Sequence, residues 1–225
     1  PQEVDKFLDM VIRDYSEYIS IIKKLEKDIK DLTEDNMKLK QLLEQMDYCV
    51  VKGTDEVEIT ELIYDSRKVC EDCLFICIKG ANFDGHDYAA QVADKAKVLI
   101  VSREMPELKG MDVTVIQVED TRYAMAFISA AYFEHPADKL KVIGITGTKG
   151  KTTTTYLVKS ILENAGFKVG LIGTIEVIIG DTHIPAHNTT PESYLLQEYF
   201  ARMAEEGCDF VVMEVSSQGI KRKRT

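Results

Sequence analysis

The sequence lacks three features that would place the chain in a membrane, outside the cell or on a polyanion. No run approaches the roughly eighteen continuous apolar residues of a membrane-spanning helix. No signal peptide is visible, so secretion is not indicated. The formal net charge is −10 at pH 7, which argues against a general role in binding nucleic acid or an anionic membrane surface.

Cysteine is scarce and irregularly placed. The five cysteines are an odd number without the spacing of a disulfide framework, which favours a reducing, cytoplasmic location. Cys70, Cys73 and Cys77 form a C-x2-C-x3-C run, but no fourth metal ligand lies nearby, and the run enters the apolar stretch CLFICIKG. We therefore predict buried core thiols in preference to a metal site.

Proline and glycine are absent from residues 2–52. Over most of this stretch, from Val4 to Leu43, apolar residues recur at alternating intervals of four and three, with one asparagine in the series. This heptad pattern predicts a coiled-coil helix over residues 1–44 that self-associates as a dimer through residues 4–43. The alternative is one amphipathic helix packed against the chain's own globular part.

Beyond the heptads, short apolar runs alternate with helical patterns. We predict strands at 58–67, 73–80, 97–104 and 113–120, and helices at 86–96 and 121–135. This alternation predicts a small α/β domain over residues 45–138.

A second α/β domain, with a parallel sheet, is predicted over residues 139–225. Its expected elements are strands at 141–146, 167–174 and 209–214, a helix at 152–165, a turn at Gly180-Asp181 and a loop over 183–193. Thr190 is expected to cap a further helix, which starts at Pro191 and ends at Gly207. The predicted fold class of the chain is thus α/β, preceded by a coiled-coil helix.

The segment KVIGITGTKGKTTTTY (141–156) points most directly to chemistry. A strand enters a glycine-rich turn and a hydroxyl-rich helix follows, which is the setting of a phosphate-binding loop. Loop N–H groups and the helix N-terminus can both face an anion there. The match to the general pattern is imperfect, because Ile145 stands where the first glycine belongs. The predicted cofactor-binding residues are Gly147, Thr148, Lys149, Gly150, Lys151, Thr152 and Thr153.

Two residues are predicted to be catalytic. Lys151 would place a mobile charge on the β- and γ-phosphates, and the hydroxyl of the neighbouring Thr152 would bind Mg²⁺. Glu214 ends an apolar strand, where folds with a phosphate-binding loop hold Mg²⁺. The alternative for Glu214 is an ordinary carboxylate at a strand end.

Five motifs occur in order along the chain: DSR (65–67), GANFDGHDY (80–88), GITGTKGKTTT (144–154), HNTTPE (187–192) and MEVSSQGI (213–220). Together they resemble the Mur ligase family, specifically its UDP-N-acetylmuramoyl-tripeptide synthetase (MurE) type, over residues 37–225. The resemblance implies a UDP-binding domain and part of a P-loop ATPase domain. It also implies an ATP-dependent amide ligase of peptidoglycan precursor synthesis, which adds an amino acid to UDP-MurNAc-L-Ala-D-Glu through an acyl phosphate.

The resemblance implies ATP and Mg²⁺ as cofactors, a UDP-MurNAc-peptide as substrate and a set of substrate-binding residues. Uridine-nucleotide contacts would come from Ser66, Ala81, Asn82 and Phe83. Muramoyl-peptide contacts would come from Asn188, Thr189, Thr190, Ser216 and Arg224. The alternatives are helix capping for the two threonines and a solvated basic tail for Arg224.

Residues 1–36 resemble the N-terminal coiled coil of the DivIVA/GpsB cell-division proteins, which implies dimerisation and cell-division partners. Mur ligases continue beyond the point that corresponds to Thr225, so we expect an unpaired sheet edge, uncovered apolar faces and nucleotide binding without complete ligation. One alternative is a non-catalytic coiled-coil scaffold fused to a partial ligase domain. Another is a different Mur-type ligase, such as the MurF type.

Overall fold

The computed structural model describes residues 37–80 and 83–225. Most of the predicted coiled coil falls on residues 1–36, outside the described residues. Its described end differs from the prediction, because Met37–Lys38 form strand β1 and Leu39–Leu43 form the short helix α2. Leu39 and Leu43, which were expected on the coiled-coil seam, are 0 % exposed. They are buried in the chain's own fold, where α2 contacts α4 (Thr121–Tyr132), so a coiled coil through residue 44 is wrong for this stretch.

The first five-stranded sheet has the order β2-β7-β6-β5-β4. Its four strands from β4 to β7 are parallel, and the edge strand β2 runs antiparallel to β7. The short strand β3 (Glu58–Ile59) pairs with β1 instead. The strands of the sheet are β2 (Cys49–Lys52), β4 (Leu62–Ile63), β5 (Leu74–Ile76), β6 (Val98–Val101) and β7 (Thr114–Gln117).

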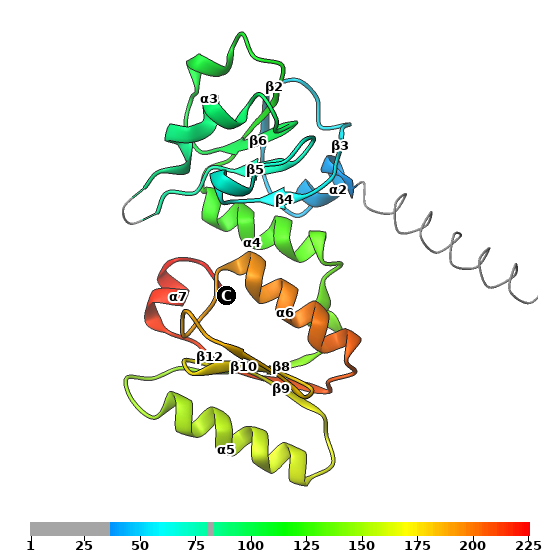
Figure 1. The fold of residues 1–225 in the computed structure, drawn as a ribbon, viewed down its shortest axis with the longest axis vertical. Helices are drawn as coiled ribbons and strands as arrows, with labels where there is room; N and C mark the ends of the chain where they lie inside the picture. The colour runs from blue at the N-terminus through cyan, green and yellow to red at the C-terminus, as the bar shows by residue number, and fades with distance from the viewer. Residues whose placement is uncertain (1–36, 81–82) are drawn as a thin grey trace, which may run out of the picture. The chain divides into compact units, whose positions relative to one another are not determined.

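Both faces of the parallel strands of this sheet are mostly buried, whereas the edge strand β2 is exposed. Phe75 and Leu99 share one core cluster with α3 (Ala89–Val92) and with the thiols of Cys73 and Cys77, as the apolar run predicted. Neighbouring strand residues point to the opposite face, on which Figure 1 shows α4. The helix predicted over 86–96 is shorter than expected, since a 3₁₀ turn (Gly85–Tyr88) precedes α3. Further 3₁₀ turns are Ser66–Lys68, Pro106–Leu108 and Pro136–Lys139.

The second five-stranded sheet has the order β11-β10-β9-β12-β8. Strands β9, β12 and β8 are parallel, and β10 pairs antiparallel with both β9 and β11. The hairpin β10–β11 includes residues 183–185, which were expected in a loop. The strands are β8 (Lys141–Ile145), β9 (Val169–Ile172), β10 (Glu176–Ile179), β11 (Thr182–Pro185) and β12 (Phe210–Glu214).

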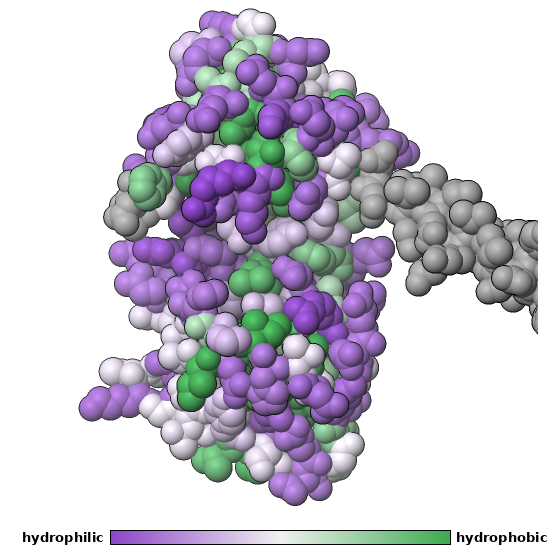
Figure 2. Space-filling view, in the orientation of Figure 1, coloured by the Kyte–Doolittle hydropathy of each residue, from purple (hydrophilic) through white to green (hydrophobic). Residues whose placement is uncertain are grey.

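Two helices cover opposite faces of the second sheet, α5 (Lys151–Asn164) and α6 (Ser193–Glu205), as Figure 1 shows. The cover is incomplete beside β8, an edge strand in the described part of the chain. Val142 of β8 is 41 % exposed, and Leu157 and Ile161 of α5 are 58 % and 67 % exposed. This agrees with the expected unpaired edge and uncovered apolar surface. On the face drawn in Figure 2, hydrophobic residues form separate patches among hydrophilic ones.

The helix predicted to start at Pro191 starts at Ser193 instead, and its N-cap position is Glu192. Thr190 does not cap it, which corrects the capping prediction. The Thr190 hydroxyl is 3.0 Å from the carbonyl oxygen of Glu214, to which it donates a hydrogen bond. This tertiary partner takes the hydroxyl away from the helix terminus.

Residues 38–225 form one compact unit, and side chains link its two large sheets. The ring of Tyr194 on α6 lies 5.6 Å from that of Tyr64 and 5.2 Å from that of Phe133. Lys223 pairs with Asp120 at 3.0 Å. Among the residues that the structure describes, no helix has the length and apolarity to cross a membrane.

Candidate functional site

The predicted phosphate-binding loop connects β8 to α5. Gly150, at the N-cap of α5, has φ of +78°, a left-handed conformation that glycine adopts without strain. Because glycine has no side chain to cap the helix, no side-chain cap from the described residues occupies the first N–H groups of this 14-residue helix. These groups, with the helix dipole, form a site suited to an anion.

The side chains of the loop are accessible. Gly147, Thr148, Lys149, Gly150 and Thr153 are exposed, and Lys151 and Thr152 are half-buried. The Nζ atom of Lys151 donates to the carbonyl oxygen of Gly147 at 2.9 Å, so the ammonium group lies across the loop. The loop thus has the backbone and the cation that binding a nucleotide phosphate requires.

Glu214 lies beside this loop because of strand register. It ends β12, and its partner across the parallel pair is Ile145, the last residue of β8 before the loop. Glu214 is 1 % exposed. Both carboxylate oxygens accept hydrogen bonds from Thr174, one from its N–H at 2.8 Å and one from its hydroxyl at 3.0 Å. The carboxylate is therefore held in a fixed orientation.

The sequence did not point to Thr174. It follows the carboxyl end of β9, the strand next to β12. Its place at that strand end was the only indication in the sequence, and no motif marks it. The structure shows that it orients Glu214 and that its hydroxyl, whose proton goes to the carboxylate, accepts a hydrogen bond from the hydroxyl of Thr189 at 3.0 Å.

The oxygen atoms here fit a hard divalent cation. No cationic side chain forms an ion pair with Glu214 in the described residues, although the carboxylate is buried. No group of three or more metal-ligating side chains occurs in the same residues. Mg²⁺ in nucleotide sites typically takes one or two carboxylates and completes its shell with phosphates and water. Glu214 is one carboxylate of that kind, and the Thr152 hydroxyl belongs to the first turn of α5, the helix that follows the loop.

Thr190 joins Glu214 to a second group of predicted residues. Its hydroxyl is buried, donates to the Glu214 carbonyl and accepts the N–H of Ser216 at 2.9 Å. Ser216 caps α7 (Ser217–Lys221) by accepting the N–H of Gly219 at 3.0 Å. The predicted peptide-binding residues Thr189, Thr190 and Ser216 thus lie in one hydrogen-bonded network, whereas Asn188 is exposed.

Arg224 belongs to the same network and is not a solvated tail residue. It is 8 % exposed. One terminal nitrogen donates to the carbonyl oxygen of Thr190 at 2.8 Å, and the other donates to the carboxylate of Glu192 at 2.5 Å. Its Nε atom is buried and has no acceptor among the described residues.

Ser66 and Phe83, the two described residues of the predicted uridine contacts, line one pocket of about 490 Å³. Phe83 is 72 % exposed, which leaves its ring available for stacking. Ala81 and Asn82 lie outside the described residues. The other residues that line the pocket are Tyr64, Asp65, Arg67, Phe75, Ile78, Gly80, Gly85, Tyr88 and Glu192.

The loop that carries Phe83 is anchored by His86. This buried side chain lies 2.6 Å from Asp84 through Nδ1, and its Nε2 accepts the N–H of Ser102 at 3.0 Å. Asp84, His86 and Ser102 are thus arranged like the members of a catalytic triad. However, the Nε2 atom of His86, which would act as the base, already accepts a hydrogen bond from the backbone N–H of Ser102. His86 holds the loop against the end of β6 and is not a catalytic base.

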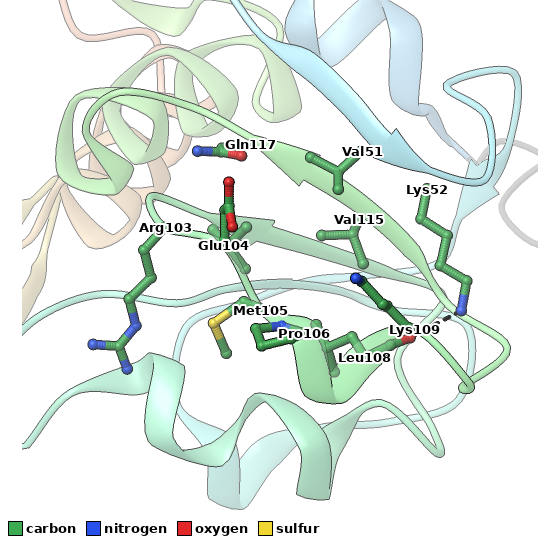
Figure 3. A pocket seen from close by; sticks show the side chains of 11 residues that line it. Val51, Lys52, Arg103, Glu104, Met105, Pro106, Leu108, Lys109, Val115 and Gln117 are labelled. Carbon is green, nitrogen blue, oxygen red and sulfur yellow. Dashed lines mark hydrogen bonds between the residues drawn. The ribbon is translucent and has the colours of Figure 1, made fainter.

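A second pocket, of about 470 Å³, lies against β2, β6 and β7 (Figure 3). Val51 and Val115 line it together with Met105 and Leu108. The Lys52 ammonium group donates to the carbonyl oxygen of Leu108 at 2.9 Å, beside the pocket. None of the predicted site residues lines this pocket, so we assign the candidate site to the other three groups: the phosphate loop, the Glu214 network and the Phe83 pocket.

Comparison with known families gives two matches. Residues 58–133 match the model described as "Mur ligase family, catalytic domain". Residues 145–225 match the model described as "Mur ligase middle domain". The first segment contains Ser66 and Phe83, and the second contains the phosphate-binding loop and Glu214.

Curated relatives include two proteins named UDP-N-acetylmuramoyl-L-alanyl-D-glutamate–2,6-diaminopimelate ligase. The one from Clostridium perfringens is 48 % identical over 189 residues, which are 84 % of this chain and 39 % of that protein. One from Clostridium acetobutylicum is 50 % identical over 184 residues, 82 % of this chain and 38 % of that protein. The chain therefore spans about two fifths of the length of these relatives.

Solved structures share the fold. A structure titled as the same type of diaminopimelate ligase aligns with a TM-score of 0.67 at 21 % identity and covers 84 % of this chain and 38 % of its own. A MurF structure from Acinetobacter baumannii aligns with a TM-score of 0.53 at 26 % identity and covers 81 % of this chain and 36 % of its own.

Proposed function

Because this chain belongs to the Mur ligase family through two of its domains, we propose that it carries the nucleotide- and muramoyl-peptide-binding parts of an ATP-dependent amide ligase. The proposed substrate is UDP-MurNAc-L-Ala-D-Glu, in agreement with the names of its relatives. The amino acid that those names give is 2,6-diaminopimelate. The proposed domains are 45–138, for the uridine nucleotide, and 139–225, for ATP.

One observation supports this proposal most directly. The phosphate-binding loop and Glu214 lie at the carboxyl ends of adjacent parallel strands, β8 and β12, as the register shows. Ligands of open α/β sheets bind at this edge. The network of Thr190, Ser216 and Arg224 is bonded to the same end of β12, so ATP and the peptide carboxylate would meet there.

The chemistry follows from these positions. A carboxylate is a poor acyl donor, and transfer of the γ-phosphoryl group from ATP converts it into an acyl phosphate with phosphate as leaving group. Such transfer mainly requires positioning and charge neutralisation. We infer that Lys151 moves from the Gly147 carbonyl to the phosphates, while the N-terminus of α5 binds them through N–H groups. A bound Mg²⁺ would neutralise phosphate charge, held by Thr152 and by Glu214 in the orientation that Thr174 fixes.

Two other functions remain as alternatives. A MurF-type ligase is less well supported, because the relatives at 48 % and 50 % identity carry the diaminopimelate-ligase name. The other alternative, a non-catalytic scaffold, requires that the chain self-associates through residues 4–43 and binds cell-division partners. That prediction falls mainly on residues outside the described range.

The proposal is tested by isothermal titration of the chain with UDP-MurNAc-L-Ala-D-Glu and, separately, with Mg·ATP. We expect both ligands to bind. Lys151→Ala should weaken Mg·ATP binding at least about tenfold, through loss of a charge-assisted contact, and leave the muramoyl ligand unaffected. Lys95→Ala is the matched control, because it removes the same charge from an exposed position outside the loop, and it should leave Mg·ATP binding unchanged. If neither ligand binds to the wild-type chain, the proposal is wrong.

A further inference from the structure

We propose that Glu192 is a positioning residue, which fixes the orientation of Arg224 and sets it relative to the nucleotide pocket. This inference rests on the proposed function, because it assumes that Arg224 contacts the muramoyl peptide. It concerns a residue that the sequence did not single out as part of the site.

Glu192 lies between two arginines from different parts of the chain. One carboxylate oxygen accepts a terminal nitrogen of Arg224 at 2.5 Å, and the other accepts a terminal nitrogen of Arg122 at 3.2 Å. Arg122 belongs to the first turn of α4, next to the first sheet. Glu192 precedes α6, next to the second sheet. A single carboxylate therefore links the helix of one domain to the arginine of the other.

Arg122 is itself fixed from the other side. Its guanidinium group donates twice to the carbonyl oxygen of Lys79, at 3.1 and 3.3 Å. Lys79 immediately precedes the segment that carries Phe83. A continuous series of hydrogen bonds thus runs from the nucleotide-binding segment through Arg122 and Glu192 to Arg224.

Burial makes these contacts stronger than surface ion pairs. The Arg224 side chain is 8 % exposed, that of Arg122 is 19 % exposed and that of Glu192 is 26 % exposed. Arginine matches a carboxylate through a planar fork of donors, which fixes direction as well as distance. Both terminal nitrogens of Arg224 donate hydrogen bonds, which hold its guanidinium group in one orientation. The N–H group at Nε, which has no acceptor among the described residues, is therefore held in one direction as well.

Glu192 also lines the pocket that contains Ser66 and Phe83. The same side chain thus borders the proposed uridine site and holds the proposed peptide-binding arginine. The two ends of a UDP-MurNAc-dipeptide would contact these two places. Loss of the Glu192 carboxylate should therefore weaken the binding of the UDP-MurNAc-dipeptide. The binding of free UDP, without the muramoyl peptide, should change little.

The test is a double-mutant cycle on the full chain, read by isothermal titration with UDP-MurNAc-L-Ala-D-Glu. We expect Glu192→Gln and Arg224→Ala each to weaken binding about tenfold. In the Arg224→Ala background, Glu192→Gln should change the Kd by less than about twofold, because Glu192 acts through Arg224. Glu205→Gln is the matched control, since it removes the same charge from an exposed position at the opposite end of α6.

The outcomes separate this inference from the proposed function. Equal binding by wild type and Glu192→Gln, or fully additive losses in the cycle, would overturn the positioning role and leave the proposed function standing. Failure of the wild-type chain to bind the ligand would overturn both. Arg122→Gln is a second variant in case Glu192→Gln unfolds. It should weaken the muramoyl ligand by a larger factor than UDP, because it loosens both Glu192 and the Lys79 carbonyl, and equal losses for both ligands would contradict the inference.

Discussion

At the scale of single residues, Thr190 connects the two parts of the candidate site in the second domain. Its hydroxyl is buried and bonds both the carbonyl of Glu214 and the N–H of Ser216. A buried backbone group that loses its partner costs about 1–3 kcal/mol. The side chain therefore contributes to stability as well as to the proposed peptide site.

Thr190→Val retains the shape of the side chain and removes the hydrogen bonds of the hydroxyl to Glu214 and Ser216. We expect the free energy of unfolding to fall by about 1–3 kcal/mol, measured by urea denaturation. Thr190→Ser retains the hydroxyl and should lose less than half as much. A Val variant as stable as the wild type would show that these bonds contribute nothing.

Glu214 permits a sharper test of the proposed metal site. Glu214→Gln retains the size of the side chain but replaces one acceptor with an NH₂ group, which cannot accept the Thr174 bond or bind a cation. We expect the Mg²⁺-dependent part of ATP affinity to disappear, as measured by titration of ATP with and without Mg²⁺. If Mg²⁺ still strengthens ATP binding in the variant as much as in the wild type, Glu214 is not a ligand.

At the scale of elements, the N-terminus of α4 depends on Asp120. The Asp120 carboxylate accepts the N–H groups of Arg122 at 2.8 Å and Tyr123 at 3.3 Å, which makes it the N-cap. It also pairs with Lys223. Because that ion pair is largely exposed, the cap should contribute more to stability.

Replacement of this cap separates the two contributions. Asp120→Ala should lower the free energy of unfolding by about 1 kcal/mol more than Asp120→Asn, because asparagine still accepts the helix N–H groups. Chemical denaturation of both variants measures the difference. Equal losses would mean that the ion pair, and not the cap, accounts for the stabilisation.

Elements whose formation depends on local pattern were predictable. The phosphate-binding loop follows from an apolar strand and a glycine-rich turn, and the structure places it between β8 and α5. The true start of α6 was not predictable, because the Thr190 hydroxyl bonds a strand far away in sequence. Thr174 and Glu192 were missed for the same reason, since each acquires its role from a partner brought near by folding.

The heptad pattern could not show which surface buries Leu39 and Leu43. An apolar face of this spacing can pack against a second chain or against a helix of the same chain, and in the structure α2 contacts α4.

At the scale of the whole described unit, charged and aromatic contacts join the parts of the chain built on the two large sheets. Burial alone would raise the pKa of Asp120, but Lys223 and the N–H groups of Arg122 and Tyr123 lower it below the usual 3.8. The charged form is therefore favoured by folding. The ionised Asp120 carboxylate therefore stabilises the folded state above about pH 4. This stabilisation is lost as the pH falls through the lowered pKa.

The difference in melting temperature between the wild type and Asp120→Asn measures this contribution. We expect it to stay constant from pH 7 to about pH 4 and to shrink below that range. A difference that does not change with pH would show that the ionisation of Asp120 is not linked to folding.

The position of β8 at a sheet edge has a consequence for how ligand binding could be observed. In the described part of the chain, β8 is bonded to β12 on one side only. The amide groups on its other edge have no strand partner among the described residues, and their protons should exchange with solvent deuterium faster than those of β12. A nucleotide held by the loop after β8 would restrain this strand more than any other. Slower deuterium uptake across residues 141–153 would then report binding directly, before any product is formed.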